Sequence, residues 1–139
     1  MFRNILLPVD LSSRHQEALK IAGSLATQSG GELTLFHVIE LLQGAPQLEE
    51  EAFYRRLEAK ARSHLGRLQA HVEREAVRCR LMVVYGDRAA EIVRHAAEMR
   101  SDLIVMSSHR VKFDSPGLSW GTLSYKVGIL AQCPVLLVK

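Results

Sequence analysis

Five short apolar runs restrict what this chain can fold into more than any other feature. Most are apolar almost throughout and do not alternate with polar residues, which is typical of β-strands covered on both faces. Segments between them repeat their apolar positions every three or four residues, the period of an amphipathic helix. We therefore predict five strands, over residues 4–9, 32–39, 79–85, 102–107 and 133–139.

The helical segments carry recognisable boundaries. Ser13 and Gln16 have capping-box spacing, which predicts that the first helix begins there, and Gly30 and Gly31 mark its end. Asp87 is a suitable N-cap for the third helix. The first helix has an apolar stripe made of Ala18, Leu19, Ala22, Leu25 and Ala26. The other helices are predicted over about 47–74, from Asp87 to about 99, and over about 119–131.

The predicted order is a strict alternation of five strands and four helices. This pattern favours an α/β fold with an open, five-stranded parallel sheet, doubly wound with helices on both faces, as in Rossmann-like folds. With 139 residues and no linker, the chain is expected to be one domain over 1–139. Residues 41–51 are expected to be a loose surface loop.

Composition narrows the class of protein. The chain is 47% apolar, with a formal charge of +3 from basic residues that are mixed with acids, so nucleic-acid binding is not favoured. No segment resembles a signal peptide or a membrane span, and we expect a cytoplasmic protein with no membrane association. Cys79 and Cys133 lack metal-ligand spacing and are expected to be buried, reduced thiols.

A ligand site is predicted where the strand order reverses, beyond the carboxyl ends of the strands. If the first and fourth strands are neighbours, residues 8–13 and 106–110 meet there. Asp10 would then accept a hydrogen bond from a ribose or an adenine amino group, or would only cap the first helix. Gly121 and Thr122 would bind an anion at a helix start, or would form an ordinary loop and cap.

The chain resembles the universal stress protein family, of the adenine-nucleotide alpha hydrolase-like fold, over essentially its whole length. The segments that carry the resemblance are ILLPVDLSSRHQEAL, LTLFHVIE, VVYGDRAAEIVRHA, DLIVMSSHR and GTLSYKVGILAQCPVLLVK. The resemblance implies a small stress-response regulator that binds ATP or AMP, with Mg²⁺ accompanying ATP and no tightly bound metal. It also implies a homodimer through residues 133–139, an edge strand that a second copy would cover.

Carried onto this sequence, the family's nucleotide site gives nine candidate residues. Asp10 would meet the adenosine part, with the backbone near Pro8 and Val38 beside the base. The family's phosphate cradle is a glycine, two residues, a second glycine, nine residues and then Gly-Ser or Gly-Thr. The candidate set is Pro8, Asp10, Val38, Met106, Ser107, Arg110, Gly121, Thr122 and Leu123.

The cradle departs from the family pattern in this chain. Ser107 and Arg110 stand where the first two glycines belong, and ten residues, not nine, separate Arg110 from Gly121. Glycine lets a backbone approach phosphate closely, whereas arginine offers a charged fork for phosphate oxygens. Two outcomes are open: nucleotide binding aided by charge, or a dimeric protein-interaction module whose degenerate pocket no longer takes nucleotide.

No catalytic residue is assigned. His109 follows two serines, but no G-x-S-x-G pattern and no third partner accompany them, and there is no P-loop lysine motif. We therefore expect a binding protein, with slow ATP hydrolysis as the least supported alternative. His37 falls in a strand, and the remaining histidines are expected on helix surfaces without metal-ligand spacing: His15, His64, His71 and His95.

Overall fold

The computed structural model describes residues 1–41, 47–108 and 122–139. Its five strands form one parallel sheet in the order β3-β2-β1-β4-β5, so the strand order reverses at β1. This confirms the predicted fold class and the predicted pairing of the first and fourth strands. The strands are β1 (Asn4–Pro8), β2 (Glu32–Ile39), β3 (Arg78–Tyr85), β4 (Leu103–Ser107) and β5 (Val135–Val138).

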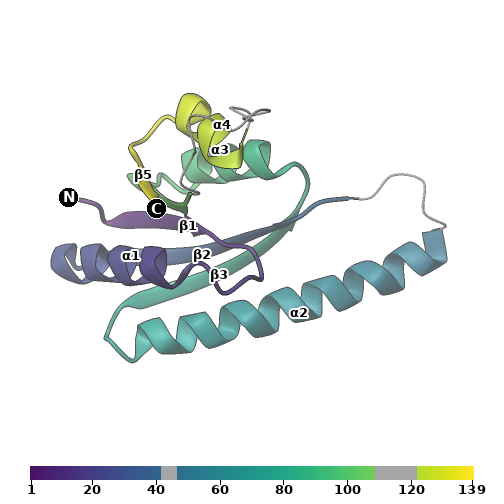
Figure 1. Cartoon of the computed structure of the whole chain (residues 1–139). Coiled ribbons are helices and arrows are strands. Elements are labelled where there is room, and N and C mark those ends of the chain that lie inside the picture. The colour runs from purple at the N-terminus through teal and green to yellow at the C-terminus, as the bar shows by residue number, and fades with distance from the viewer. Residues whose placement is uncertain (42–46, 109–121) are drawn as a thin grey trace.

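Two helices cover each face of the sheet. Figure 1 shows α1 and α2 on one face and α3 and α4 on the other. The second helix is much the longest, and its N-terminal part projects beyond the sheet (Figure 1). The helices are α1 (Gln16–Ser29), α2 (Gln47–Glu73), α3 (Arg88–Glu98) and α4 (Leu123–Leu130).

The two faces have separate apolar cores, which explains why the strands are apolar throughout. Leu7 packs with the residues of α1 and α2, whereas its neighbour Leu6 packs with those of α3 and α4. The predicted stripe of α1 lies in the first core, with Leu25 only partly buried. Phe36 is the largest fully buried side chain of the second core. Because successive strand residues point to opposite faces, each strand contributes to both cores.

Two helix starts and one loop differ from the prediction. The capping box is wrong: α1 begins at Gln16 with His15 at its N-cap and no side-chain cap bond. The backbone of Ser12 instead donates to Asp10 Oδ1 (2.8 Å), which holds the preceding residues in a turn. In α4, Thr122 is an extended N-cap, so the helix begins after it; residues 119–121 lie outside the described part. Residues 47–51 were predicted both in the loose loop 41–51 and in the second helix; they are helical, as the helix prediction had them.

The predicted cap of α3 is confirmed. The Asp87 side chain accepts a hydrogen bond from the backbone of Ala90 (3.0 Å). The preceding Gly86 has a φ of +146°, and a Cβ there would lie 2.8 Å from the Glu91 side chain. Only glycine fits this turn without strain, so it fixes where β3 ends and α3 begins.

The cysteines fit the expectation in part. Both are free; Cys79 is buried, whereas Cys133 is only half-buried. Burial, assisted by Glu73 and Glu32, raises the pKa of the Cys79 thiol to about 12, so that thiol is a poor nucleophile. In the described part of the chain, no helix is long and apolar enough to cross a membrane.

Candidate functional site

A pocket lies beyond the carboxyl ends of β1, β2 and β4, where the strand order reverses. We call it the switch pocket. One side is apolar, and the other carries ionisable side chains from the β1–α1 connection, β2 and the start of α3. Its described lining residues are Pro8, Val9, Asp10, Arg14, His15, Phe36, His37, Val38, Arg88, Ile92, Met106, Ser107 and Leu123.

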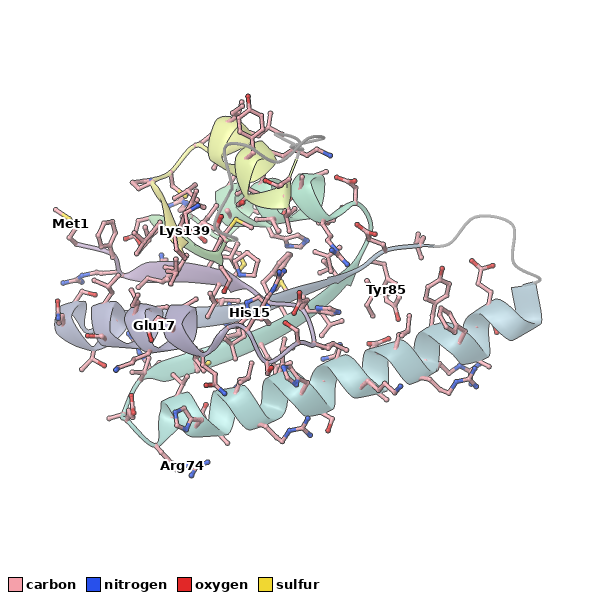
Figure 2. The ribbon with its side chains drawn as sticks, viewed as in Figure 1. Met1, His15, Glu17, Arg74, Tyr85 and Lys139 are labelled. Carbon is pink, nitrogen blue, oxygen red and sulfur yellow. The ribbon has the colours of Figure 1, made fainter. Side chains whose placement is uncertain are left out.

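His15 joins the two loops that meet at this pocket. It is 6% exposed and lies in the connection between β1 and α1, where Figure 2 labels it. Its Nε2 is 2.8 Å from Asp10 Oδ1, and its Nδ1 is 2.8 Å from Ser107 Oγ. The imidazole therefore connects residues that are 97 positions apart (107 − 10) in the sequence.

The charge on Asp10 decides which ring nitrogen of His15 carries the proton. Nε2 also lies 3.1 Å from the backbone nitrogen of Asp10, which would require Nε2 to be an acceptor. A carboxylate oxygen at 2.8 Å cannot donate, so two lone pairs would then face each other. We assign the proton to Nε2, which donates to Asp10, while the Ser107 hydroxyl donates to Nδ1.

Asp10 is a carboxylate and His15 is neutral near pH 7. Burial alone would raise the pKa of Asp10, but hydrogen bonds from the hydroxyl and backbone of Ser12 and from His15 hold it well below its usual range. Burial is the largest influence on the pKa of His15 and lowers it; the Asp10 carboxylate raises the pKa, Arg14 and His64 lower it further, and the result lies below the usual value. Arg14 Nη2 pairs with Asp10 Oδ2 at 2.9 Å.

This arrangement predicts that acid weakens the fold through His15. The pKa of His15 is lower in the folded chain than in the unfolded chain, so the unfolded chain binds more protons once the pH falls below about 6.5. Stability that is present at pH 7.5 is therefore lost towards pH 5.5. His15→Gln keeps one donor and one acceptor, and its urea midpoint should fall less between these two pH values. His71→Gln, at an exposed position on α2, is the control, and its urea midpoint should fall as much as that of the wild type. If the midpoint of His15→Gln also falls that much, His15 is not the group that makes acid weaken the fold.

Two further ionisable side chains face the pocket. His37 Nδ1 donates to the carbonyl of Val9 (2.8 Å), which fixes the ring at the end of β2. Arg88, at the first position of α3, pairs with Glu40 at 3.4 Å. The polar side of the pocket thus contains one carboxylate, two guanidinium groups and two imidazoles, which suits a ligand with hydroxyl and anionic groups.

The structure brings most of the predicted site residues together. Six of the nine line the switch pocket: Pro8, Asp10, Val38, Met106, Ser107 and Leu123. Thr122 is exposed and acts as the N-cap of α4, accepting from the Tyr125 backbone at 3.4 Å. Arg110 and Gly121 lie outside the described residues, as do His109 and the rest of residues 109–121.

Sequence reasoning missed several residues of the pocket. The expectation that His15 lies on a helix surface is wrong, because α1 begins one residue later and the turn before it points the ring inward. Arg14, Phe36, Arg88 and Ile92 also line the pocket. The available signal was position: Arg14 and His15 follow Asp10 within five residues, directly after the segment 8–13 that was predicted to meet residues 106–110.

The switch pocket also contains a linked row of polar side chains. Ser107, His15 and Asp10 form a linked row of hydroxyl, imidazole and carboxylate. Such a row can activate a serine, but here Arg14 neutralises the carboxylate that would stabilise a charged imidazole. Among the described residues, no three His, Cys, Asp or Glu side chains are placed to hold a metal ion.

Comparison with known proteins identifies the family. The model of the universal stress protein family matches residues 1–139. The chain belongs to the universal stress protein family. It is 34% identical over 142 residues to a Thermus aquaticus universal stress protein, and the match covers 100% of both chains.

Solved structures of the family share the fold. The Methanocaldococcus jannaschii protein MJ0577 is 25% identical, with a TM-score of 0.78 over 100% of this chain and 97% of that chain. An Archaeoglobus fulgidus universal stress protein solved in complex with dAMP has a TM-score of 0.73 at 19% identity, covering 99% of this chain and 98% of that one. A universal stress protein solved in complex with cAMP has a TM-score of 0.71 at 21% identity, covering 99% and 97%.

Proposed function

We propose that the chain binds an adenine nucleotide, ATP or AMP, in the switch pocket and acts as a cytoplasmic stress-response regulator. The observation that carries this proposal is the ionised Asp10 at the carboxyl end of β1, facing an apolar wall formed by residues such as Val38, Met106 and Leu123. A purine fits such a wall, and a ribose hydroxyl can donate to the carboxylate. The dAMP and cAMP complexes of two proteins with this fold support the choice of ligand class.

The decisive experiment is direct. Purified protein is denatured and the supernatant is searched for adenine nucleotide by chromatography; the nucleotide-free protein is then titrated calorimetrically with ATP, with and without Mg²⁺, and with AMP. We expect saturable heat with one site per chain, and GTP as the control ligand should bind more weakly. Absence of both released nucleotide and heat at millimolar concentrations would overturn the proposal.

The alternative role, an interaction module with a closed pocket, also has an observation in its favour. The Asp10 oxygens already accept from Ser12, Arg14 and His15 within the protein, so a ligand hydroxyl must compete with them. The calorimetric titration separates the two roles, because a closed pocket gives no heat.

We also propose that two copies of the chain pair through β5. This strand is at the edge of the sheet and bonds only to β4 within the described residues. Leu136 and Leu137 on it are 38% and 39% exposed, and Ile129 and Leu130 of the neighbouring α4 are more exposed still. An unpaired edge beside apolar side chains is a surface that a second copy can cover symmetrically.

Leu137→Glu should convert this dimer to a monomer. A charge placed at the centre of an apolar contact between two strands must be desolvated twice, once in each copy. Sedimentation of the wild type at micromolar concentration should give twice the chain mass, and the variant should give the mass of one chain. Leu41→Glu, at an exposed leucine beyond the end of β2, is the matched control and should stay dimeric. A monomeric wild type contradicts the proposal.

We propose no enzymatic role. The pairing of Arg14 with Asp10 and the burial of His15 support this view, because they leave the row ending in Ser107 without a strongly polarising carboxylate. Phosphate release from ATP above background, lost in Ser107→Ala, would contradict it.

A further inference from the structure

A second hollow adjoins the switch pocket at its polar end. It lies between the start of α1 and the carboxyl ends of β4 and β5, and we call it the lateral hollow. Figure 2 shows Lys139 at the end of β5, with Glu17 on α1. Two residues, Arg14 and Ser107, line both hollows, so the two hollows are adjacent. The lateral hollow is lined by Arg14, Glu17, Ser107, Ser108, Val138 and Lys139.

The walls of the lateral hollow carry cations and hydroxyl groups. Lys139 Nζ donates to Ser108 Oγ at 3.2 Å, which leaves the Ser108 hydroxyl hydrogen able to donate in turn. Ser108 Oγ also lies 3.3 Å from Ser124 Oγ in the first turn of α4. A guanidinium fork, an ammonium and a hydroxyl donor are the side-chain groups that proteins use to bind phosphate oxygens.

Arg14 lies on the border between the switch pocket and the lateral hollow. It pairs with Asp10 Oδ2 at 2.9 Å on the side of the switch pocket, and its side chain is 45% exposed on the border of the lateral hollow. A phosphate in the lateral hollow would carry more negative charge than the Asp10 carboxylate, which is already hydrogen-bonded to Ser12 and His15. Moving Arg14 to the phosphate would leave Asp10 Oδ2 to accept from the ligand.

We propose that the lateral hollow is a phosphate site, in which Arg14 and Lys139 bind the phosphate of a nucleoside phosphate whose base lies in the switch pocket. The identity of the base rests on the proposed function; the phosphate site does not. Charged side chains then do what the family's glycine backbone would do, at the point where this chain has Ser107 in place of glycine. Arg14 and Lys139 are thereby the residues that select a nucleoside phosphate over a nucleoside.

Glu17 allows a test in which two substitutions have opposite effects on phosphate binding. Its carboxylate is the acidic side chain of the lateral hollow, so it opposes binding of an anion. Its removal should strengthen phosphate binding, while removal of Lys139 should weaken it. If the substitutions only disturbed the fold, both would weaken phosphate binding, and the two affinities would not change in opposite directions.

The first experiment uses inorganic pyrophosphate alone. The protein is titrated at low salt and its backbone amide signals are followed by NMR. We expect saturable shifts at Ser108 and Lys139 that are lost in Lys139→Met and that weaken at high salt. Lys20→Met, an exposed lysine on the outer side of α1, is the control and should respond as the wild type does.

The second experiment compares adenosine with AMP by calorimetry. In the wild type AMP should bind about tenfold more tightly, the combined effect of two partly exposed charge pairs, one with Arg14 and one with Lys139. In Lys139→Met and Arg14→Met the ratio should fall towards one, and in Glu17→Gln it should rise.

The outcomes separate this proposal from the proposed function. If adenosine binds but AMP binds no better, the phosphate site is overturned and nucleoside binding stands. The same holds if the ratio of AMP affinity to adenosine affinity is the same in Lys139→Met as in the wild type. If pyrophosphate shifts Ser108 and Lys139 while adenosine and AMP do not bind, the phosphate site stands and the proposed function fails. If no ligand has any effect, both fail.

Discussion

Replacing Phe36 by alanine should lower the free energy of unfolding by about 3–5 kcal/mol, the usual effect of removing a fully buried phenylalanine. Phe36 is 0% exposed, and its ring lies 5.1 Å from that of His95, with Ile92 and Val127 in the same core. The strands on both sides of β2 are held by backbone hydrogen bonds, so the cavity cannot close easily. For a domain with about 5–15 kcal/mol in total, this loss is large.

Urea unfolding followed by circular dichroism measures this effect. Phe53→Ala is the matched control, because Phe53 lies on α2 and is 37% exposed; it should cost less than about 1 kcal/mol. Similar losses of unfolding free energy in both variants would contradict the full burial of Phe36 in the second core. Phe36 also lines the switch pocket, so a folded Phe36→Ala variant should bind nucleotide more weakly.

Asp10→Asn should weaken nucleotide binding by about 10- to 100-fold. A hydrogen bond from a ligand hydroxyl to a carboxylate contributes about 1.5–3 kcal/mol, which converts to roughly this factor. Asparagine has the same shape but no charge, so Arg14 also loses its ion pair at Oδ2 and His15 loses its charged acceptor. The effect should be measured calorimetrically with adenosine, AMP and adenine.

The comparison of ligands locates the contact. If Asp10 meets the ribose, adenine affinity should change little in Asp10→Asn while adenosine affinity falls. Asp87→Asn is the control, because asparagine caps a helix as well as aspartate does and Asp87 lies outside the described pocket lining. Equal loss for adenine and adenosine would place the carboxylate at the base instead, and no loss at all would remove Asp10 from the site.

The pocket could be located from the sequence, but its polar network could not. Parallel strands place their carboxyl ends at one edge, so residues that follow the first and fourth strands must meet wherever those strands are neighbours. Asp10 and Ser107 were placed together in this way, whereas Val38 and Leu123 were predicted only through the resemblance to the family; all four line the pocket. The orientation of His15 could not be predicted, because it depends on the seven-residue connection between β1 and α1 and on a contact with Ser107, 92 residues away.

The pairing of charged side chains also could not be predicted from the sequence. The sequence shows Asp10, Arg14, Glu17 and Lys139 but not which of them pair, since an ion pair depends on distances of a few ångströms between segments. The structure shows Arg14 on the border of two hollows and bonded to Asp10.

The apolar runs, their helical spacers and the glycine turn before Asp87 by themselves determine the strand and helix order, because local periodicity and steric limits act within a few residues. Tertiary structure alone decides that His15 is buried between β1 and β4, and that Lys139 at the end of β5 lies beside Ser108 at the end of β4. Those contacts exist only once the sheet has assembled, since residues far apart in the chain meet through strand pairing and not through local sequence.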